Sequence, residues 1–286
     1  MWSTPDVDWS RIGAPIDVRS RFPEERALLL ELLSSLGESQ WSAETVCPGW
    51  SVKDIVGHLV HDYTRRLSGH RDGRRPSGLA AESQLPAYLA KANGDFVAAV
   101  RDLSPRVLTD MLELFGPQLD AVWAGCDLAA TGAISVSWAV PGVPAPVWLD
   151  VAREYTEFWV HQQQIRDAVG VPGADRSELL RPVIDILLRA LPRTLDNVQA
   201  SDGTAVTIIV GGVVDRAWTV RRDRAEWTMG GGAGDSGRGV RVTTTPETVW
   251  RLATGGITPE VAWQRITVDG DERLAAAVLW IVSIVR

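Results

Sequence analysis

Several features are scarce in this 286-residue sequence, and each scarcity excludes a class of protein. Only Cys47 and Cys126 are present, too few for the disulfide framework that stabilises small secreted domains. No apolar run approaches the roughly 20 residues that a membrane-spanning helix needs. The stretch from Met1 to Phe22 contains Pro, Asp and Arg where a signal peptide would be apolar. We therefore expect a cytoplasmic protein with two ordinary, unpaired thiols and no contact with a membrane.

Positive charge is scarce as well. The chain carries 29 basic and 36 acidic residues, a formal net charge of −7, whereas nucleic-acid binding normally requires a basic face. Hydrophobic residues make up 45% of the sequence and charged residues 23%, which are values of a globular chain. The composition predicts a globular protein that does not bind nucleic acid, and we expect it to be a monomer.

Helical patterns dominate the first two thirds of the chain. Residues 23–37 begin with a proline in the first turn, followed by acidic residues and a leucine stripe, and end at a glycine. Ser51 and Asp54 have the spacing of a capping box, which predicts that a second helix starts at about Val52. Prolines exclude a regular helix from 134 to 146. The predicted helices of this part are 23–37, 52–68, 85–103, 105–115, 146–169 and 177–199.

The pattern changes near residue 200. Segments rich in β-branched residues predict strands, and two later segments have helical spacing. The predicted strands are 206–214, 217–222, 225–229 and 240–244, and the predicted helices are 246–254 and 271–285. The sequence therefore predicts an α+β protein, with a helical domain over residues 1–200 and a smaller α/β domain over residues 201–286.

The clearest chemical signal is the pair Glu157 and His161 on the predicted helix 146–169. Four residues apart, they share one face at a backbone distance of about 6 Å, which suits two ligands of one metal ion. A third ligand must come from another helix. His58 is a candidate, because it lies among apolar neighbours where an imidazole without a partner is unfavourable.

Spacing alone leaves this assignment open. His61 and Asp62 compete with His58 on the same predicted helix, and Glu154 competes with Glu157 from one turn earlier. Each feature also has an ordinary structural interpretation, namely a buried histidine with a hydrogen-bond partner or a surface Glu–His contact.

A resemblance resolves the choice. The stretch CPGWSVKDIVGHL at 47–59, followed about a hundred residues later by Glu157-x-x-x-His161 and by IRDAVG at 165–170, resembles the mycothiol-dependent maleylpyruvate isomerase family. That family belongs to the DinB-like metalloenzymes. The resemblance covers essentially the whole chain, and it implies a DinB-like four-helix bundle that binds metal, followed by a smaller α/β domain similar to sterol carrier protein.

The resemblance also implies a site and a reaction. In the family, a histidine of the second helix and a glutamate and a histidine of a later helix bind zinc, and they match His58, Glu157 and His161. Two imidazoles and a carboxylate suit Zn²⁺ or another divalent metal, and three protein ligands leave coordination positions open. The implied cosubstrate is a small-molecule thiol, mycothiol, whose metal-bound thiolate attacks an electrophilic substrate.

Two outcomes of this attack are implied. In a cis–trans isomerase the thiol adds to a conjugated cis-alkene, the new single bond rotates, and elimination returns the trans isomer. In a thiol S-transferase the adduct is released. The alternative from another class is a non-catalytic protein that binds a metal, a thiol or a lipid.

The sequence departs from the family pattern after the second histidine. Many relatives carry an aromatic residue and an aspartate there, whereas this chain has Gln162, Gln163 and Gln164, whose side chains point to different sides of a helix. We interpret this as a subfamily difference that leaves the ligands intact and bears on the substrate. Arg166 is a candidate catalytic residue that binds a carboxylate on the substrate or the thiol. Its structural alternative is an ion pair with Asp62 or Asp167.

Overall fold

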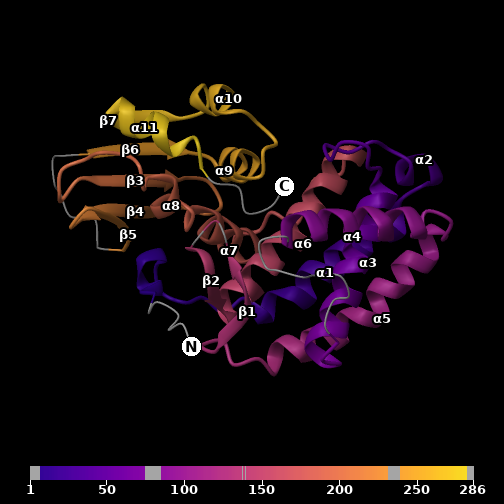
Figure 1. Cartoon of the computed structure of the whole chain (residues 1–286). Helices are drawn as coiled ribbons and strands as arrows, with labels where there is room; N and C mark the ends of the chain where they lie inside the picture. The colour runs from indigo at the N-terminus through magenta and orange to yellow at the C-terminus, as the bar shows by residue number, and fades with distance from the viewer. Residues whose placement is uncertain (1–6, 75–84, 137, 139, 231–238, 282–286) are drawn as a thin grey trace. The chain divides into compact units, whose positions relative to one another are not determined.

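The computed structural model describes residues 7–74, 85–136, 138, 140–230 and 239–281 (Figure 1). Contacts between Cα atoms divide the chain into two compact units. One, which we call the helical unit, comprises Asp17–Ala130 and Glu157–Ala174, and the other, the sheet unit, comprises Met1–Ile16, Thr131–Thr156 and Asp175–Arg286. The predicted α+β class is confirmed. The boundary predicted at residue 200 lies inside the sheet unit.

The helical unit is built from four long helices and the second half of a fifth. Its elements are η2 (Arg19–Arg21), α1 (Phe22–Ser35), α2 (Glu38–Trp41), α3 (Val52–Arg66), η3 (Leu67–Arg71), α4 (Leu85–Val100), α5 (Pro105–Ala124) and the latter part of α6 (Val147–Val169). Helix α3 packs against α4 and α5, and α1 packs against α5. Among the described residues, no helix combines the length and the hydropathy that a membrane crossing needs.

Helix α3 begins at the predicted capping box. The hydroxyl of Ser51 accepts a hydrogen bond from the backbone N–H of Asp54, and the carboxylate of Asp54 accepts one from the N–H of Ser51, at 3.0 Å. The helix is buried on most of its circumference, with Ile55, Val56 and Val60 fully inaccessible. The cap therefore fixes the start of a helix whose middle lies inside an apolar core.

The predicted end of α5 at residue 115 is wrong, because the helix continues through Pro117 to Ala124. Its last turns bury Leu119 and Trp123, and this burial offsets the backbone hydrogen bond that proline cannot make. A Cβ atom on Gly116 would lie 2.3 Å from Cδ of Arg26, so glycine is needed where the arginine side chain of α1 crosses α5.

The sheet unit contains a two-stranded and a five-stranded sheet. Its elements are η1 (Trp9–Ile12), β1 (Thr131–Val136), β2 (Val140–Pro146), the first half of α6, α7 (Ser177–Leu188), α8 (Leu191–Thr194), β3 (Ala205–Val210), β4 (Arg216–Asp223), β5 (Glu226–Met229), β6 (Gly239–Thr244), α9 (Pro246–Ala253), α10 (Pro259–Trp263), β7 (Thr267–Gly270) and α11 (Glu272–Val278). The larger sheet has the order β5-β4-β3-β6-β7, and only β3 and β6 run parallel.

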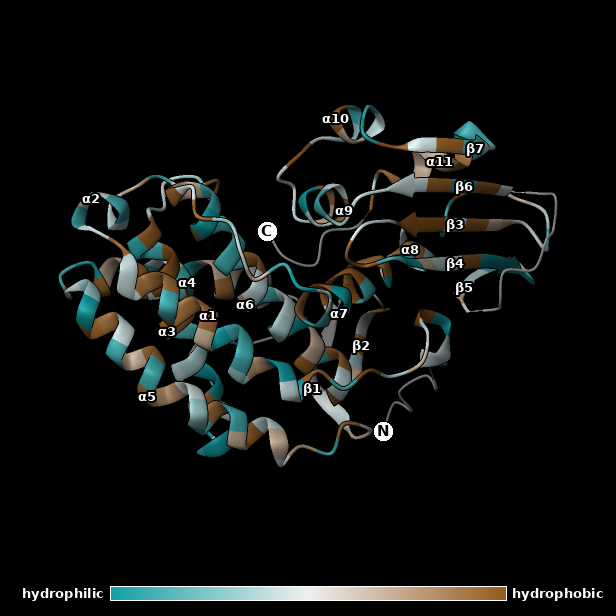
Figure 2. Cartoon of the chain, turned by 180° about the vertical axis from the view of Figure 1, so that it is seen from behind, coloured by the Kyte–Doolittle hydropathy of each residue, from teal (hydrophilic) through white to brown (hydrophobic). Residues whose placement is uncertain are grey.

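The central strand of this sheet alternates between partly exposed and buried residues, so that Val206, Ile208 and Val210 face the core. Figure 2 shows that β3 is hydrophobic over most of its length. Helix α11 packs against β6, and α9 packs against α7.

Several predicted boundaries change in the sheet unit. The region 177–199 is two helices, because Pro192 starts α8 in its first turn. Helix α11 ends at Val278, and residues 282–285 of the predicted segment 271–285 lie outside the described residues. Strands β1, β2 and β7 were not predicted. The exclusion of a regular helix over 134–146 agrees with the β1–β2 hairpin.

Candidate metal centre

The structure brings His58, Glu157 and His161 together, with one potential ligand atom from each lying within 4.8 Å of the others. Oε1 of Glu157 is 3.5 Å from Nε2 of His58 and 3.3 Å from Nε2 of His161. The two imidazole rings meet edge to face, with centroids 4.8 Å apart. Both histidines are buried, and the Glu157 side chain is 14% exposed. Two helices thus direct three acceptor groups at one point.

A second group of potential ligands, His58, His61 and Asp62, lies on α3 alone. Its members have other partners: Nδ1 of His61 is 2.9 Å from Oδ1 of Asn93, and Asp62 accepts a hydrogen bond of 2.7 Å from Arg65. Oδ2 of Asp62 lies 3.6 Å from Nε2 of His58. These partners make the group on α3 the weaker candidate.

Glu154, the competitor of Glu157 on the sequence, belongs to neither group among the described residues. Its side chain is fully buried, and Oε2 lies 3.3 Å from the guanidinium of Arg153. Of the two glutamates, Glu157 is therefore the one that faces the histidines.

The electrostatics around His161 favour a cation. Burial lowers the pKa of the His161 imidazole, but its hydrogen bonds with Cys47 and Glu157 outweigh burial and raise the pKa to about 10. A positive charge at Nε2 of His161 is thus stabilised by the carboxylate of Glu157. A divalent cation bound to the same two atoms would displace the proton.

The opposite nitrogen of His161 has its own partner. Nδ1 lies 2.7 Å from Oε1 of Gln164, and the thiol of Cys47 donates to the same oxygen over 3.3 Å. Nδ1 of His58 is buried and has no hydrogen-bond partner within the described part of the chain. The ring of Trp50 lies beside His58, with centroids 5.3 Å apart.

The three consecutive glutamines point in different directions, as predicted. Nε2 of Gln162 donates to Oε1 of Glu25 at 2.7 Å, and Nε2 of Gln163 donates to the backbone oxygen of Gly173 at 3.0 Å. Only Gln164 has a described hydrogen bond with a predicted ligand, His161. This contact was not predicted from the sequence, although the i, i+3 spacing after His161 was a usable signal.

Arg166 lies on another side of α6. Its guanidinium donates to Oε1 of Gln162 at 3.0 Å and to backbone oxygens of Leu28, Val171 and Pro172 at 3.1 to 3.4 Å. These bonds connect α6 to α1 and to the loop after α6. The binding of a substrate carboxylate by Arg166 stays a prediction.

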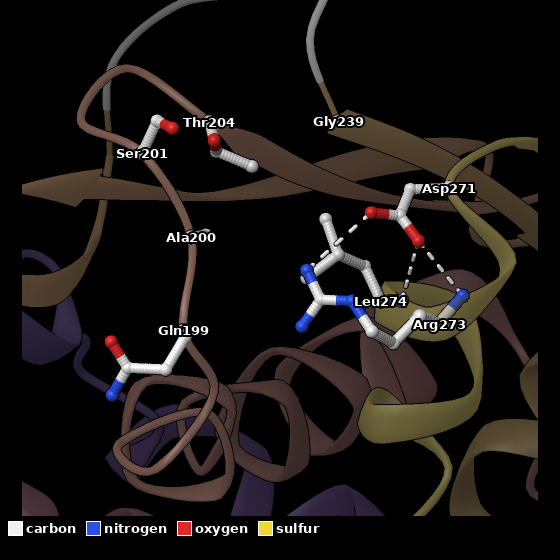
Figure 3. A pocket seen from close by; sticks show the side chains of 8 residues that line it. All are labelled: Gln199, Ala200, Ser201, Thr204, Gly239, Asp271, Arg273 and Leu274. Atoms are coloured by element: carbon white, nitrogen blue, oxygen red, sulfur yellow. Dashed lines mark hydrogen bonds and ion pairs between the residues drawn. The ribbon is translucent and has the colours of Figure 1, made fainter.

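A separate hollow of about 610 Å³ lies in the sheet unit (Figure 3). Its polar lining includes Gln199, Ser201, Thr204, Asp271 and Arg273. Asp271 accepts hydrogen bonds from the backbone N–H groups of Arg273 and Leu274, and so caps α11. The carboxylate is thus engaged in helix capping, and the group of three acceptors in the helical unit is the stronger candidate site.

Comparisons with known proteins give a family and a fold. The family model described as the mycothiol maleylpyruvate isomerase N-terminal domain matches residues 22–166. Among solved structures, the mycothiol-dependent maleylpyruvate isomerase is similar at 12% sequence identity, over 89% of this chain and 93% of that chain. The TM-score is 0.52 for the crystal structure of a point mutant and 0.50 for another crystal structure of that enzyme. Among curated proteins no sequence matches.

Proposed function

Because the chain belongs to the mycothiol maleylpyruvate isomerase N-terminal domain family, we propose that it is a divalent-metal enzyme that uses a small-molecule thiol against an electrophilic carbon. In this proposal His58, Glu157 and His161 hold the metal, which we take to be zinc, and mycothiol is the thiol. The reaction is either a cis–trans isomerisation, in which the thiol is returned, or an S-transfer, in which sulfur stays bonded to carbon.

The observation that carries the proposal is the convergence of three acceptor atoms from two helices within 4.8 Å. Two imidazole nitrogens and one carboxylate oxygen are a donor set that zinc prefers, and three protein ligands are typical of catalytic rather than structural zinc. When bound, a divalent cation lowers the pKa of a coordinated thiol and so supplies a thiolate nucleophile at neutral pH.

The residues of the chain supply position and shielding. Helix α3 holds His58 between buried apolar positions, and α6 holds Glu157 and His161 one turn apart on a single face. The ring of Trp50 lies next to that of His58, and His58 is 3% exposed. The 14% exposure of Glu157 leaves one side of the group accessible to a small molecule.

The alternative function, a lipid-binding role for the sheet unit, has less support. An apolar space in this unit is lined by Ile208, Val242, Leu279 and neighbouring residues, but its volume is about 30 Å³. Ligand pockets usually have volumes of about 300–1,000 Å³, so this space is small for an acyl chain. We also propose a cytoplasmic location, which is supported by two cysteines that are not joined in a disulfide.

The first test is the metal content of the wild type and of His161→Ala, both purified without added metal. We expect about one cation per chain in the wild type and its loss in the variant, since three ligands define a catalytic site. His70→Ala is the matched control, because this histidine lies against Trp123 and outside both ligand groups. It should keep the metal.

The same three proteins are then incubated with mycothiol and a set of conjugated cis-alkenes that includes maleylpyruvate. Turnover by the wild type and by His70→Ala, but not by His161→Ala, would support the enzyme. A wild type that contains no metal and takes up none when it is added would overturn the proposal. A metal-loaded wild type without turnover on any electrophile would favour the non-catalytic alternative.

A further inference from the structure

The surroundings of His161 include a fourth residue, Gln164, beside the three proposed ligands. We propose that Gln164 is a positioning residue: its side-chain oxygen accepts the Nδ1–H of His161 and so holds the imidazole with Nε2 directed at the metal. This inference rests on the proposed function, since it concerns the same site.

The hydrogen-bond pattern defines which end of the Gln164 amide faces the histidine. Oε1 of Gln164 lies 2.7 Å from Nδ1 of His161 and 3.3 Å from Sγ of Cys47. An imidazole that binds a cation through Nε2 must carry its proton on Nδ1, and a thiol is a donor. Two donors therefore converge on one atom, and an oxygen rather than an NH₂ group fits that place.

The spacing along α6 makes the contact local. Glu157, His161 and Gln164 lie at positions i, i+4 and i+7, which share one face of a helix. Gln164 is 6% exposed, so water competes little for its oxygen. The ring of His161 is thus held at Nε2 by Glu157 and at Nδ1 by Gln164, 3.3 and 2.7 Å away.

The side-chain amide of Gln164 is neutral, and this affects the net charge of the proposed metal site. Histidine ligands are commonly oriented by a carboxylate, which adds a negative charge behind the ring. With an amide in that position, Glu157 is the one anionic group of the proposed ligand set, and a divalent cation keeps one net positive charge there. That charge matches a single thiolate. Gln164 therefore orients the ring without weakening the attraction of the site for an anionic sulfur.

The test is the affinity for Zn²⁺, measured by competition with a chromogenic chelator, and the visible spectrum of the Co²⁺ form. Gln164→Leu removes the acceptor and keeps an apolar side chain in a buried position. We expect a fall in affinity of about 10- to 100-fold, the usual effect of losing the outer partner of a histidine ligand. We also expect altered Co²⁺ bands, because the imidazole is free to rotate.

Two further variants separate positioning from packing. Gln164→Glu restores an acceptor for Nδ1–H and should recover the affinity, while Gln163→Leu, whose native amide binds the backbone of Gly173, should leave affinity and spectrum unchanged. Circular dichroism establishes that each variant is folded. If Gln164→Leu is not folded, Gln164→Met, which keeps the length of the side chain, provides the same comparison.

The outcomes distinguish this inference from the proposed function. A wild type that binds neither Zn²⁺ nor Co²⁺ would overturn both. A wild type that binds them, with a folded Gln164→Leu that binds within about threefold of it and shows the same Co²⁺ spectrum, would overturn the role of Gln164 alone. If Gln164→Glu lost as much Zn²⁺ affinity as Gln164→Leu, the positioning role of Gln164 would also be refuted.

Discussion

Two buried polar clusters, one in each unit, differ in how their hydrogen-bonding groups are matched. In the sheet unit, the carboxylate of Asp185 accepts hydrogen bonds from the guanidinium of Arg189 at 2.7 and 3.1 Å and from the indole of Trp218 at 2.6 Å. Every short contact there joins a donor to an acceptor. In the helical unit, the short contacts around Glu157 join it to one ring nitrogen of each of two histidines, and the tautomer decides whether that nitrogen donates or accepts.

This difference separates a structural cluster from a candidate binding site. A buried polar group is tolerated when it has a partner of opposite character, and the Asp185 cluster meets that condition internally. The two imidazoles and the carboxylate of the Glu157 group can meet it through an imidazole N–H, and each can instead offer a lone pair to one metal ion. The burial of polar side chains therefore does not distinguish the two clusters, whereas the convergence of three potential metal ligands makes the Glu157 group the candidate site.

The largest effect on stability is expected in the Asp185 cluster. Asp185→Ala leaves the buried charge of Arg189 without its partner, and we expect the free energy of unfolding to fall by about 3–5 kcal/mol. The affinity for Zn²⁺ of the folded protein should not change. Denaturant unfolding and chelator competition measure the two quantities.

The control for this variant is Glu247→Ala, which breaks the surface pair with Arg251. The Glu247 side chain is 62% exposed, and such pairs contribute at most about 1 kcal/mol. A similar loss in both variants would show that the buried cluster is no more important than a surface ion pair.

At Glu157 the expected effect is a loss of metal affinity. Structural zinc sites with four ligands bind with about 10–16 kcal/mol, or roughly 2.5–4 kcal/mol for each ligand, so Glu157→Gln should weaken metal binding by about 60- to 700-fold. Asp62→Asn removes the carboxylate of the competing group on α3 and should keep the metal. The reverse order of affinities would assign the metal to α3 instead.

The sequence could predict the parts of this site that follow from local spacing. Ser51 and Asp54 fixed the start of α3, and the separation of Glu157 and His161 placed both on one face of α6. The convergence of His58 with them needed the family resemblance, because spacing does not say which face of α3 meets α6. The contact of Gln164 with His161 could have been predicted, because of the three adjacent amides only Gln164 stands at the i, i+3 spacing from His161.

The limits of the fold prediction have a similar origin. Pro117 ended the predicted helix, but burial of Leu119 and Trp123 keeps α5 going beyond it. The prolines between 140 and 146 excluded a helix correctly, yet they obscured strand β2, which pairs with a single neighbour and tolerates residues without an N–H. Both errors come from tertiary or edge-strand context that overrides local propensity.

A third buried polar group, Glu25 in the helical unit, should make the stability of the fold depend on pH. Burial raises the pKa of the Glu25 carboxyl group to about 7, against the opposing hydrogen bond from Gln162. A carboxyl group with a higher pKa in the folded state stabilises the fold below its ordinary pKa of 4.5, and this stabilisation is lost as the pH rises to about 7. The loss is on the order of 3 kcal/mol.

Glu25→Gln should remove this pH dependence, because the amide has no proton to release. Glu31→Gln, at an exposed position of the same helix, should retain it. Unfolding by urea at several values between pH 4.5 and 7.5 provides the measurement. If the free energy of unfolding changed equally with pH in the wild type and both variants, Glu25 would not be the source of the pH dependence.

The smallest effect concerns the helix caps, one in each unit. The hydroxyl of Ser51 accepts from the N–H of Asp54 at 3.3 Å, and that of Thr245 accepts from the N–H of Thr248 at 3.2 Å. Ser51→Ala and Thr245→Ala should each lower the unfolding free energy by about 1 kcal/mol. Neither should alter Zn²⁺ affinity, although Ser51 caps the helix that carries His58, because the cap lies nearly two turns away. If Ser51→Ala weakened metal binding as much as Gln164→Leu, the position of α3 rather than the orientation of His161 would control the affinity.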